Sequence, residues 1–215
     1  MSEYVAFFID GNFLFRRMTF LKAFFLTGPA IREYCARHLV TGEKLFDIFY
    51  YDSEPLTHCV KNPATGKDFD FRKTETAVAV SIMLDGLRHT MGVTLRLSKP
   101  EFRKTWAITD QNSPNILRPC VYHQGLNTTL FGIDVTRIAL KHQVQRMVFI
   151  TDDVDAIIPA CDLTRSEGIH ITLDSLAGKV PDIVLDHVNE TSTEIDVDEV
   201  MAKRRHYLVM PGKAL

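Results

Sequence analysis

Short apolar runs recur along this chain and alternate with segments of helical spacing. The runs have the length of strands and fall at residues 4–10, 44–52, 93–98, 146–153 and 169–175. Nearly continuous apolar strands are typical of parallel sheets, because helices bury both faces of such a sheet. We therefore expect an α/β fold in which helices cover a parallel sheet in a three-layer, Rossmann-like arrangement.

The segments between the runs predict the covering helices. Residues 13–40 carry apolar side chains at mixed three- and four-residue intervals, and Gly28 and Pro29 divide them into two helices. Further helices are predicted at residues 71–92, 134–145, 154–168, within 176–190, and at 196–208. Gly168 is suited to end its helix as a C-terminal cap.

Residues 100–130 interrupt the alternation. This stretch is rich in prolines and turn-forming residues, so it predicts an inserted hairpin and loop. The length of 215 residues suits one domain with a small appendage. We expect a domain over residues 1–190 and a helical tail over 191–215.

Composition narrows the class of protein. A hydrophobic share of 46% supports a packed core, and a net charge of −2 excludes a globally basic protein that coats nucleic acid. The four cysteines form no CxxC pair, which predicts reduced thiols in the cytoplasm rather than a zinc site. No stretch predicts a membrane span, and the first residues, "MSEY", do not read as a signal peptide.

Carboxylates gather where the expected strands end. Asp10 ends the first strand, Asp152, Asp153 and Asp155 follow "MVFIT", and Asp134 is placed at the start of the helix that leads into that strand. Ligands of doubly wound sheets bind beyond the carboxyl ends of the strands, so we expect these side chains at one edge. Clustered carboxylates are tolerated when a cation neutralises them, and their oxygens suit Mg²⁺ or Mn²⁺.

Each of these residues also has a structural interpretation. Asp134 is equally suited to cap its helix, and one aspartate of "TDDVD" is expected to cap the helix that follows. Asn12 could stabilise the turn after the first strand. Asp52 and Asp174, which end the second and the last strand, are interpreted as turn residues rather than ligands.

Together the motifs resemble a known family. "FFIDGNFL", "YYD", "GIDV" and "VFITDDVDAIIPA" occur in the order typical of the NYN family, the LabA-like branch of the PIN-like nucleases. The resemblance covers residues 4–52 and 121–175. It implies a PIN-like parallel sheet with an acidic pocket that uses Mg²⁺ or Mn²⁺ to hydrolyse RNA phosphodiesters, in single-stranded or structured RNA.

The resemblance also implies roles for individual residues. Asp10, Asp134, Asp153 and Asp155 correspond to the metal-binding carboxylates, and Asn12 would assist the metal or the scissile phosphate. In a metal-dependent mechanism no histidine base is required, because the metal lowers the pKa of its bound water.

One motif departs from the family pattern. "TDDVDAIIP" stands where SGDSDF-x-P is usual, so that Asp152 replaces a glycine and Ala156 replaces an aromatic residue. This departure supports an alternative function, a catalytically weak or inactive NYN-fold module in nucleic-acid binding, regulation or assembly. A phosphohydrolase with an aspartyl nucleophile is disfavoured, because Asn12 stands where such enzymes need the second aspartate of DxD.

Candidate substrate contacts are weaker. Arg16 and Arg17 are the favoured phosphate contacts, because they lie about one helical turn beyond Asp10. A solvated surface is the favoured interpretation for each of the other basic candidates, Lys22, Arg72, Lys73, Arg103 and Lys104. Phe102, Trp106 and Tyr122 could stack on unpaired bases, although packing is favoured. The sequence leaves open whether the chain forms a homodimer.

Overall fold

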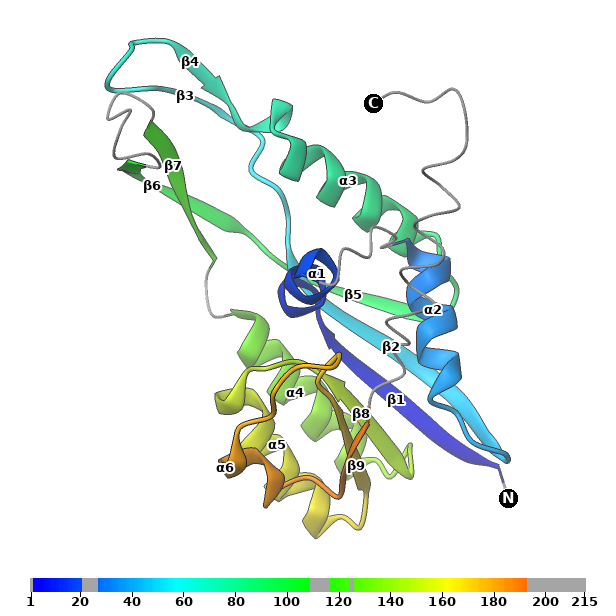
Figure 1. Ribbon diagram of the computed structural model, residues 1–215. Helices are drawn as coiled ribbons and strands as arrows, with labels where there is room; N and C mark the ends of the chain where they lie inside the picture. The colour runs from blue at the N-terminus through cyan, green and yellow to red at the C-terminus, as the bar shows by residue number, and fades with distance from the viewer. Residues whose placement is uncertain (1, 21–26, 109–116, 124–125, 193–215) are drawn as a thin grey trace.

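The computed structural model describes residues 2–20, 27–108, 117–123 and 126–192. In this part of the chain, six strands form one sheet with the order β10-β9-β8-β1-β2-β5 (Figure 1). The strands are β1 (Glu3–Asp10), β2 (Glu43–Ser53), β5 (Val93–Ser98), β8 (Arg146–Ile150), β9 (His170–Asp174) and β10 (Glu190–Ser192). Every neighbouring pair in the sheet is parallel. The predicted fold class is therefore confirmed.

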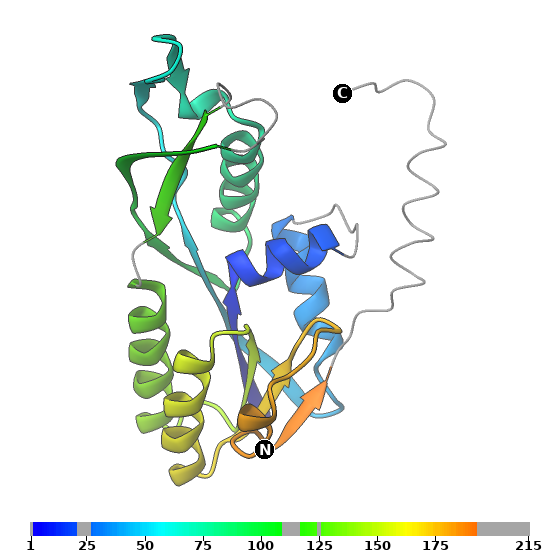
Figure 2. The ribbon, with the colours of Figure 1, turned by 60° about the vertical axis from the view of Figure 1, so that its left-hand side comes forward.

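Helices cover both faces of this sheet, as Figure 2 shows from the side. One face carries α1 (Gly11–Phe20), α2 (Gly28–Arg37) and α3 (Glu75–Arg88), and the other carries α4 (Leu126–Leu140), α5 (Val154–Ser166) and α6 (Asp182–Leu185). Gly28 and Pro29 open α2 after the capping hydroxyl of Thr27, and Gly168 takes a positive φ just after α5, as the sequence predicts.

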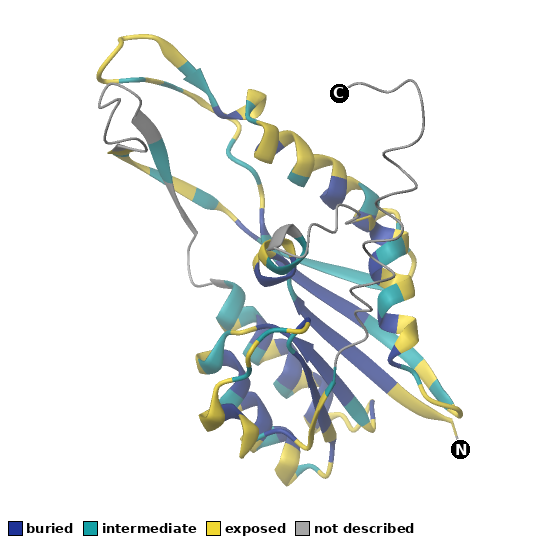
Figure 3. Ribbon diagram, in the orientation of Figure 1, coloured by how far each residue is buried: buried dark blue, intermediate teal, exposed yellow. Residues whose placement is uncertain are grey.

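The core lies on both sides of the sheet because successive side chains of a strand point to opposite faces. On β1, Val5, Phe7 and Ile9 pack under α1, α2 and α3, whereas Ala6 and Phe8 pack under α4 and α5. All five are at most 1% exposed, and the central strands form the buried band in Figure 3. Each large apolar side chain buried in this way stabilises the fold by about 1.5–3 kcal/mol.

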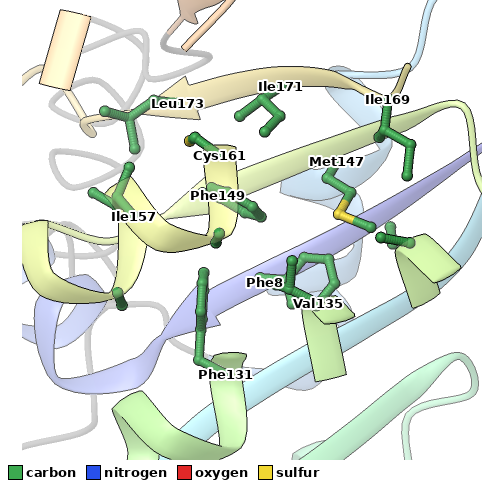
Figure 4. Packing of buried hydrophobic residues seen from close by; sticks show 14 of the residues in the cluster. Phe8, Phe131, Val135, Met147, Phe149, Ile157, Cys161, Ile169, Ile171 and Leu173 are labelled. Atoms are coloured by element: carbon green, nitrogen blue, oxygen red, sulfur yellow. The ribbon is translucent and has the colours of Figure 1, made fainter. Parts of the chain in front are cut away.

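Aromatic side chains dominate the core on the α4 and α5 face. The ring of Phe8 lies 5.6 Å from that of Phe131 on α4 and 5.5 Å from that of Phe149 on β8, measured between centroids. Figure 4 shows these rings in contact with the apolar face of α5. This packing fixes α4 against β1 and β8, close to where both strands end.

The chain changes face between two adjacent strands. β1 leads into α1 on one face of the sheet, whereas its neighbour β8 leads into α5 on the other. Ligands of open α/β sheets bind at such a switch point, because the two connections separate there and leave a crevice. Asp10 ends β1, and the residues of "TDD" follow β8 at this crevice.

Two antiparallel hairpins extend beyond the sheet and form what we call the arm (Figures 1 and 2). One pairs β3 (Cys59–Lys61) with β4 (Asp68–Asp70), and the other pairs β6 (Pro100–Ile108) with β7 (Leu117–His123). Aromatic rings join them, with centroids 5.2–6.3 Å apart, at His58, Phe69, Phe71, Phe102 and Trp106. The predicted hairpin is confirmed, and Phe102 and Trp106 pack within the arm.

Three boundaries differ from the prediction. The insertion ends before residue 130, because α4 already begins at Leu126 and the glycine at 132 does not interrupt it. Asp134 therefore lies in the third turn of α4 and does not start that helix. The sheet continues through β10 to Ser192, two residues past the expected domain boundary.

Other expectations fall partly outside the described residues. The predicted helical tail lies almost wholly in 193–215, beyond the described part of the chain. Within the described residues, no helix has the length and apolar character needed to cross a membrane. The four cysteines carry free thiols, and Cys35 and Cys161 are buried.

Candidate functional site

A pocket of about 250 Å³, which we call the acidic pocket, opens at the carboxyl ends of β1, β2 and β8. Three carboxylates line it: Asp10, Asp52 and Asp153. Neutral polar side chains from four segments complete its wall: Asn12, Ser53, Asn127, Thr128 and Thr151. The pocket thus lies at the switch point of the sheet, where the fold leaves room for a ligand.

Asp10 lies at the base of the acidic pocket. The backbone N–H of Phe13 donates to its Oδ1 at 3.1 Å, and the hydroxyl of Thr151 donates to its Oδ2 at 3.4 Å. Burial raises the pKa of Asp10, the N–H of Phe13 opposes this shift, and the nearby charge of Asp152 adds to it. A cation in the pocket would favour the ionised carboxylate and offset this cost.

Asp52 brings a second partly buried carboxylate to the same pocket. Burial raises its pKa to about 6; the hydrogen bond from the N–H of Ser53 opposes the shift, and the charge of Asp10 adds to it. Asp52 is the second-last residue of β2, and Tyr51 before it pairs with Asp10 on the neighbouring strand β1, so Asp52 lies one residue beyond the level of Asp10. Asp52 thus lies in β2 rather than in a turn, and it lines the acidic pocket.

Gly11 allows this close approach. A Cβ atom at residue 11 would lie 2.6 Å from Oδ2 of Asp52 and 2.6 Å from the hydroxyl of Tyr50. Both distances are too short for non-bonded atoms, so only glycine lets α1 begin directly against the end of β2. The close packing against β2 therefore explains why glycine follows Asp10 in "FFIDGNFL".

Asp153 connects the acidic pocket to two helices. It caps α5, with its Oδ1 accepting from the N–H of Ala156 at 3.2 Å, and its Oδ2 accepts from the hydroxyl of Thr128 at 2.7 Å. The expectation that one aspartate of "TDDVD" caps the following helix is confirmed. The hydrogen bond to Thr128 ties the first turn of α4 to the start of α5.

Asn127 leaves an unusual atom in this wall. Its Oδ1 is buried, and none of the described residues provides a hydrogen-bond partner for it. Buried polar atoms are normally paired, so this acceptor, beside partly buried carboxylates, is available to a cation or to a hydrogen-bond donor. An amide oxygen and carboxylate oxygens are the ligands that Mg²⁺ and Mn²⁺ prefer.

Few side chains of the acidic pocket are available to bind a metal ion. Across the described ranges, no three side chains of the His, Cys, Asp or Glu types converge closely enough to hold a metal ion by themselves. Mg²⁺ usually takes one or two carboxylates and keeps several waters. Asp10 and Asp153, supplemented by the amide oxygen of Asn127, are therefore the groups that could hold it.

Asp134 does not reach the acidic pocket. Its carboxylate accepts from Arg96 at 2.7 and 3.0 Å, from Arg137 at 2.9 Å and from the hydroxyl of Tyr51 at 3.1 Å. The residue is 3% exposed, and it faces β2 and β5 from the middle of α4. Two guanidinium groups neutralise it, so its contacts describe a structural ion pair.

Of the remaining predicted residues, some lie at the acidic pocket and others do not. Asp155 is exposed in the first turn of α5 and does not line the acidic pocket, whereas Asn12 does. Arg16 pairs with Asp152, both about half exposed, and lies near enough for its charge to lower the pKa of Asp10. Arg17 donates to the carbonyl of Leu176 at 2.9 and 3.2 Å, which anchors the loop after β9.

Asp174 belongs to a different, enclosed cluster. Its Oδ1 accepts from the N–H of Leu176 at 2.7 Å, as expected for a turn residue. Its Oδ2 accepts from the hydroxyl of Tyr34 and contacts Nε2 of His38 at 3.1 Å. Both His38 and Asp174 are almost fully buried, so these contacts join α2 to the loop after β9.

The other basic candidates have local partners or lie outside the described part. Arg72 pairs with Asp70 at 2.9 Å and Arg103 with Glu101 at 3.1 Å, both within the arm. Lys73 and Lys104 are exposed, and Lys22 and the side chain of Tyr122 are not described.

Sequence reasoning missed Asp52, Asn127 and Thr128 as pocket residues. A signal for Asp52 was present, because the first two strands of such a sheet are often neighbours and both end in Asp. Asn127 and Thr128 carried no comparable signal, since their segment has the composition of a loop.

The comparisons with known proteins concern the fold. No protein-family model and no curated protein matches the sequence. The crystal structure of VPA0982, a protein of unknown function from Vibrio parahaemolyticus, is similar with a TM-score of 0.52 and 11% identity, over 91% of this chain and 95% of that one. A Sir2 structure is similar with a TM-score of only 0.33 and 10% identity, over 97% of this chain and 95% of that one, which is too low to carry an argument.

Proposed function

We propose that this chain is a Mg²⁺- or Mn²⁺-dependent ribonuclease of the NYN type, with the acidic pocket as its active site. The observation that carries the proposal is the convergence of the partly buried Asp10, Asp52 and Asp153 with the Oδ1 of Asn127, unpaired among the described residues, at the switch point of the sheet. The motif resemblance supports it, because "FFIDGNFL" and "VFITDDVDAIIPA" supply Asp10 and Asp153.

Each pocket residue has a proposed task. Asp10 and Asp153 would hold the metal, and the amide oxygen of Asn127 would complete its contacts with the protein. When bound, such a metal lowers the pKa of water and stabilises charge on a phosphoryl oxygen. Asp52, whose pKa is about 6, is placed to accept a proton from water near neutral pH.

Binding of the substrate phosphate would fall to the rim of the pocket. The Arg16 guanidinium lies beside Asp10 and is about half exposed. It can approach a phosphate if it leaves Asp152. Asn12, which lines the acidic pocket and is exposed, can donate a hydrogen bond to a phosphate oxygen. RNA is accordingly the proposed partner, and the free cysteines support a reducing, cytoplasmic location.

A second candidate function has one observation in its favour. The Arg16–Asp152 pair places an extra carboxylate at the pocket, where the resemblance expects glycine. An NYN-fold module that binds RNA or a protein partner without cleaving it would tolerate this arrangement.

The test is RNA cleavage with Mn²⁺, Mg²⁺ or EDTA by the wild type, Asp10→Asn, Asp153→Asn and Asp155→Asn. We expect metal-dependent cutting by the wild type that falls at least about 100-fold in the first two variants, since each loses a charged group that acts in the transition state. Asparagine also caps helices well, so Asp153→Asn should fold. Asp155→Asn is the matched control. Asp155 is exposed and does not line the acidic pocket, so this variant should cut RNA normally.

The non-catalytic module predicts the opposite result. If folded wild type cuts no single-stranded or structured RNA with either metal, yet binds RNA or a partner protein through the same surface, the non-catalytic module is the better description. Equal cutting by Asp10→Asn and the wild type would remove the acidic pocket as the active site.

A further inference from the structure

A second cavity, which we call the arm groove, lies beside the acidic pocket and has a volume of about 650 Å³. It runs between α1, the N-terminal half of α3, the segment after β2 and the two hairpins of the arm. Asn12, Asp52 and Ser53 line both cavities, so the acidic pocket and the arm groove adjoin along a shared wall. A molecule that extends from the acidic pocket past these three residues reaches the groove.

Apolar side chains form most of the groove. Phe15 contributes from α1, where it remains 38% exposed, and Phe69 and Phe71 contribute from the arm. Val80 and Met83 contribute from α3. A partly exposed aromatic ring facing an apolar cavity is suited to a flat apolar ligand, and drug-sized ligands fill cavities of about 300–1,000 Å³.

The charged groups of the arm groove further restrict the class of ligand that it can bind. Its described lining includes the carboxylates of Asp52, Glu54 and Glu75, but no lysine or arginine. This sign of charge repels a phosphate and favours a neutral group that carries hydrogen-bond donors. Glutamate accepts well from the amino group of cytosine, and the amino groups of adenine and guanine are similar donors.

We propose that the arm groove binds a nucleobase of the RNA strand whose phosphodiester lies in the acidic pocket, and that it favours adenine, cytosine or guanine over uracil. This inference rests on the proposed function for the position of the phosphate. The base would leave the helical stack and lie against Phe15, with its amino group toward Glu54 or Glu75. Such a base must be unpaired, so the groove selects single-stranded RNA or loops.

The experiment compares two pairs of variants. Phe15→Ala removes a groove ring, and Tyr4→Ala is its control, because Tyr4 is 41% exposed at the opposite end of β1. Val80→Trp fills the groove, and Ile82→Trp is its control, because Ile82 is 69% exposed on the same helix and does not line the groove. Thermal melts establish that each variant is folded.

The probes are fluorescein-labelled 12-nucleotide single strands of A, C or U, and an A strand with one abasic residue moved stepwise. Binding is measured by fluorescence anisotropy in EDTA, and cleavage is measured separately in Mn²⁺ as kcat/KM. We expect Phe15→Ala and Val80→Trp to weaken binding and kcat/KM by about tenfold, which is the size of one lost base–aromatic contact. Both controls should match the wild type, U strands should bind more weakly, and one abasic position should slow cleavage.

The outcomes separate the two proposals. Weaker binding by both groove variants with no cleavage by any form would support the groove as a base site while the nuclease proposal fails. Cleavage that is unaffected by the groove variants and by every abasic position would overturn the groove proposal while the nuclease proposal stands. If no strand is bound or cut, both are overturned, and the groove is left to another class of partner such as a peptide.

Discussion

Nη2 of Arg16 on α1 donates to both carboxylate oxygens of Asp152, at 3.0 and 3.1 Å. The pair bridges the elements that follow β1 and β8, which diverge at the switch point of the sheet. Its two charges act on Asp10 in opposite directions, since Asp152 raises the pKa of Asp10 and Arg16 lowers it. An exposed ion pair of this kind contributes only about 0–1 kcal/mol to stability, so its main effect is on the charge of the pocket.

Replacing Asp152 with glycine should therefore alter function more than stability. Asp152→Gly releases Arg16 and removes a negative charge near Asp10, so we expect RNA to bind several-fold more tightly at low salt. The melting temperature should change by no more than a few degrees. Anisotropy titrations at two salt concentrations measure the effect, with Asp155→Asn as a control that removes an equal charge from α5. Unchanged affinity in Asp152→Gly would mean that Arg16 does not contact the phosphate.

Protonation of the acidic pocket should make the metal-free protein more stable in mild acid. The pKa of Asp52 is about 6 in the folded state, above its usual value, so the folded state binds its proton more tightly than the unfolded state does. This contribution is complete below the unfolded pKa of about 4 and is lost as the pH rises through about 6. It amounts to at most about 3 kcal/mol, because each pKa unit corresponds to about 1.4 kcal/mol.

Thermal melts in EDTA between pH 5 and pH 7.5 measure this effect. The wild type should lose stability over this interval, and Asp52→Asn, which cannot ionise, should lose less of it. The stabilisation by Mn²⁺ should change in the opposite direction and grow with pH, because the metal requires ionised carboxylates. Identical pH profiles for the wild type and Asp52→Asn would show that Asp52 is not the titrating group.

The architecture was accessible from sequence because it depends on periodicity. The apolar runs that became β1, β2 and β8 are buried on both faces, and a strand buried in that way has little choice of residue type. The end of α5 just before Gly168 was equally predictable, because the positive φ of residue 168 favours glycine. The arm was predicted only as a hairpin over 100–130. Its partner hairpin, β3–β4, is held by aromatic contacts between segments far apart in the chain.

The candidate site was only partly accessible. Asp10 and Asp153 follow strands directly, so their place at the edge of the sheet follows from the strand ends. Asp134 was misplaced because "GIDV" reads as a helix start, whereas apolar residues at 130, 131 and 135 continue one helix through it. Nothing in the local sequence shows that Arg96, on an edge strand, would meet that carboxylate. The position of Asn127 depends on the same helix, so it was missed for the same reason.

Substitution of Gly11 tests how tightly α1 is packed against the pocket. In Gly11→Ala the new Cβ would meet Oδ2 of Asp52 and the hydroxyl of Tyr50, both at 2.6 Å, so these side chains must move. We expect a loss of about 1–3 kcal/mol in stability, as for other overpacked sites, together with a marked loss of cleavage. Urea unfolding and cleavage assays measure the two effects, and Gly132→Ala on α4, where a Cβ meets open space, is the matched control. A Gly11→Ala protein with wild-type stability would contradict the geometry described here.

Substitution of Asp134 distinguishes between two roles for this residue, partner in a structural ion pair and metal ligand. Asp134→Asn keeps the size of the side chain but leaves the guanidiniums of Arg96 and Arg137 facing a neutral group in a largely buried position. Both guanidiniums keep access to water, so the loss is that of charge-assisted hydrogen bonds, about 1–3 kcal/mol, and the variant should unfold at a lower urea concentration. Its folded fraction should still show the wild-type increase in melting temperature on addition of Mn²⁺, because the metal would contact Asp10 and Asp153 instead. In the double variant Asp134→Asn/Arg96→Gln, part of the lost stability should return. If Asp134→Asn instead kept its stability and lost only the Mn²⁺ effect, Asp134 would be a metal ligand, as the sequence resemblance implies, and its ion pairs with α4 and β5 would be secondary.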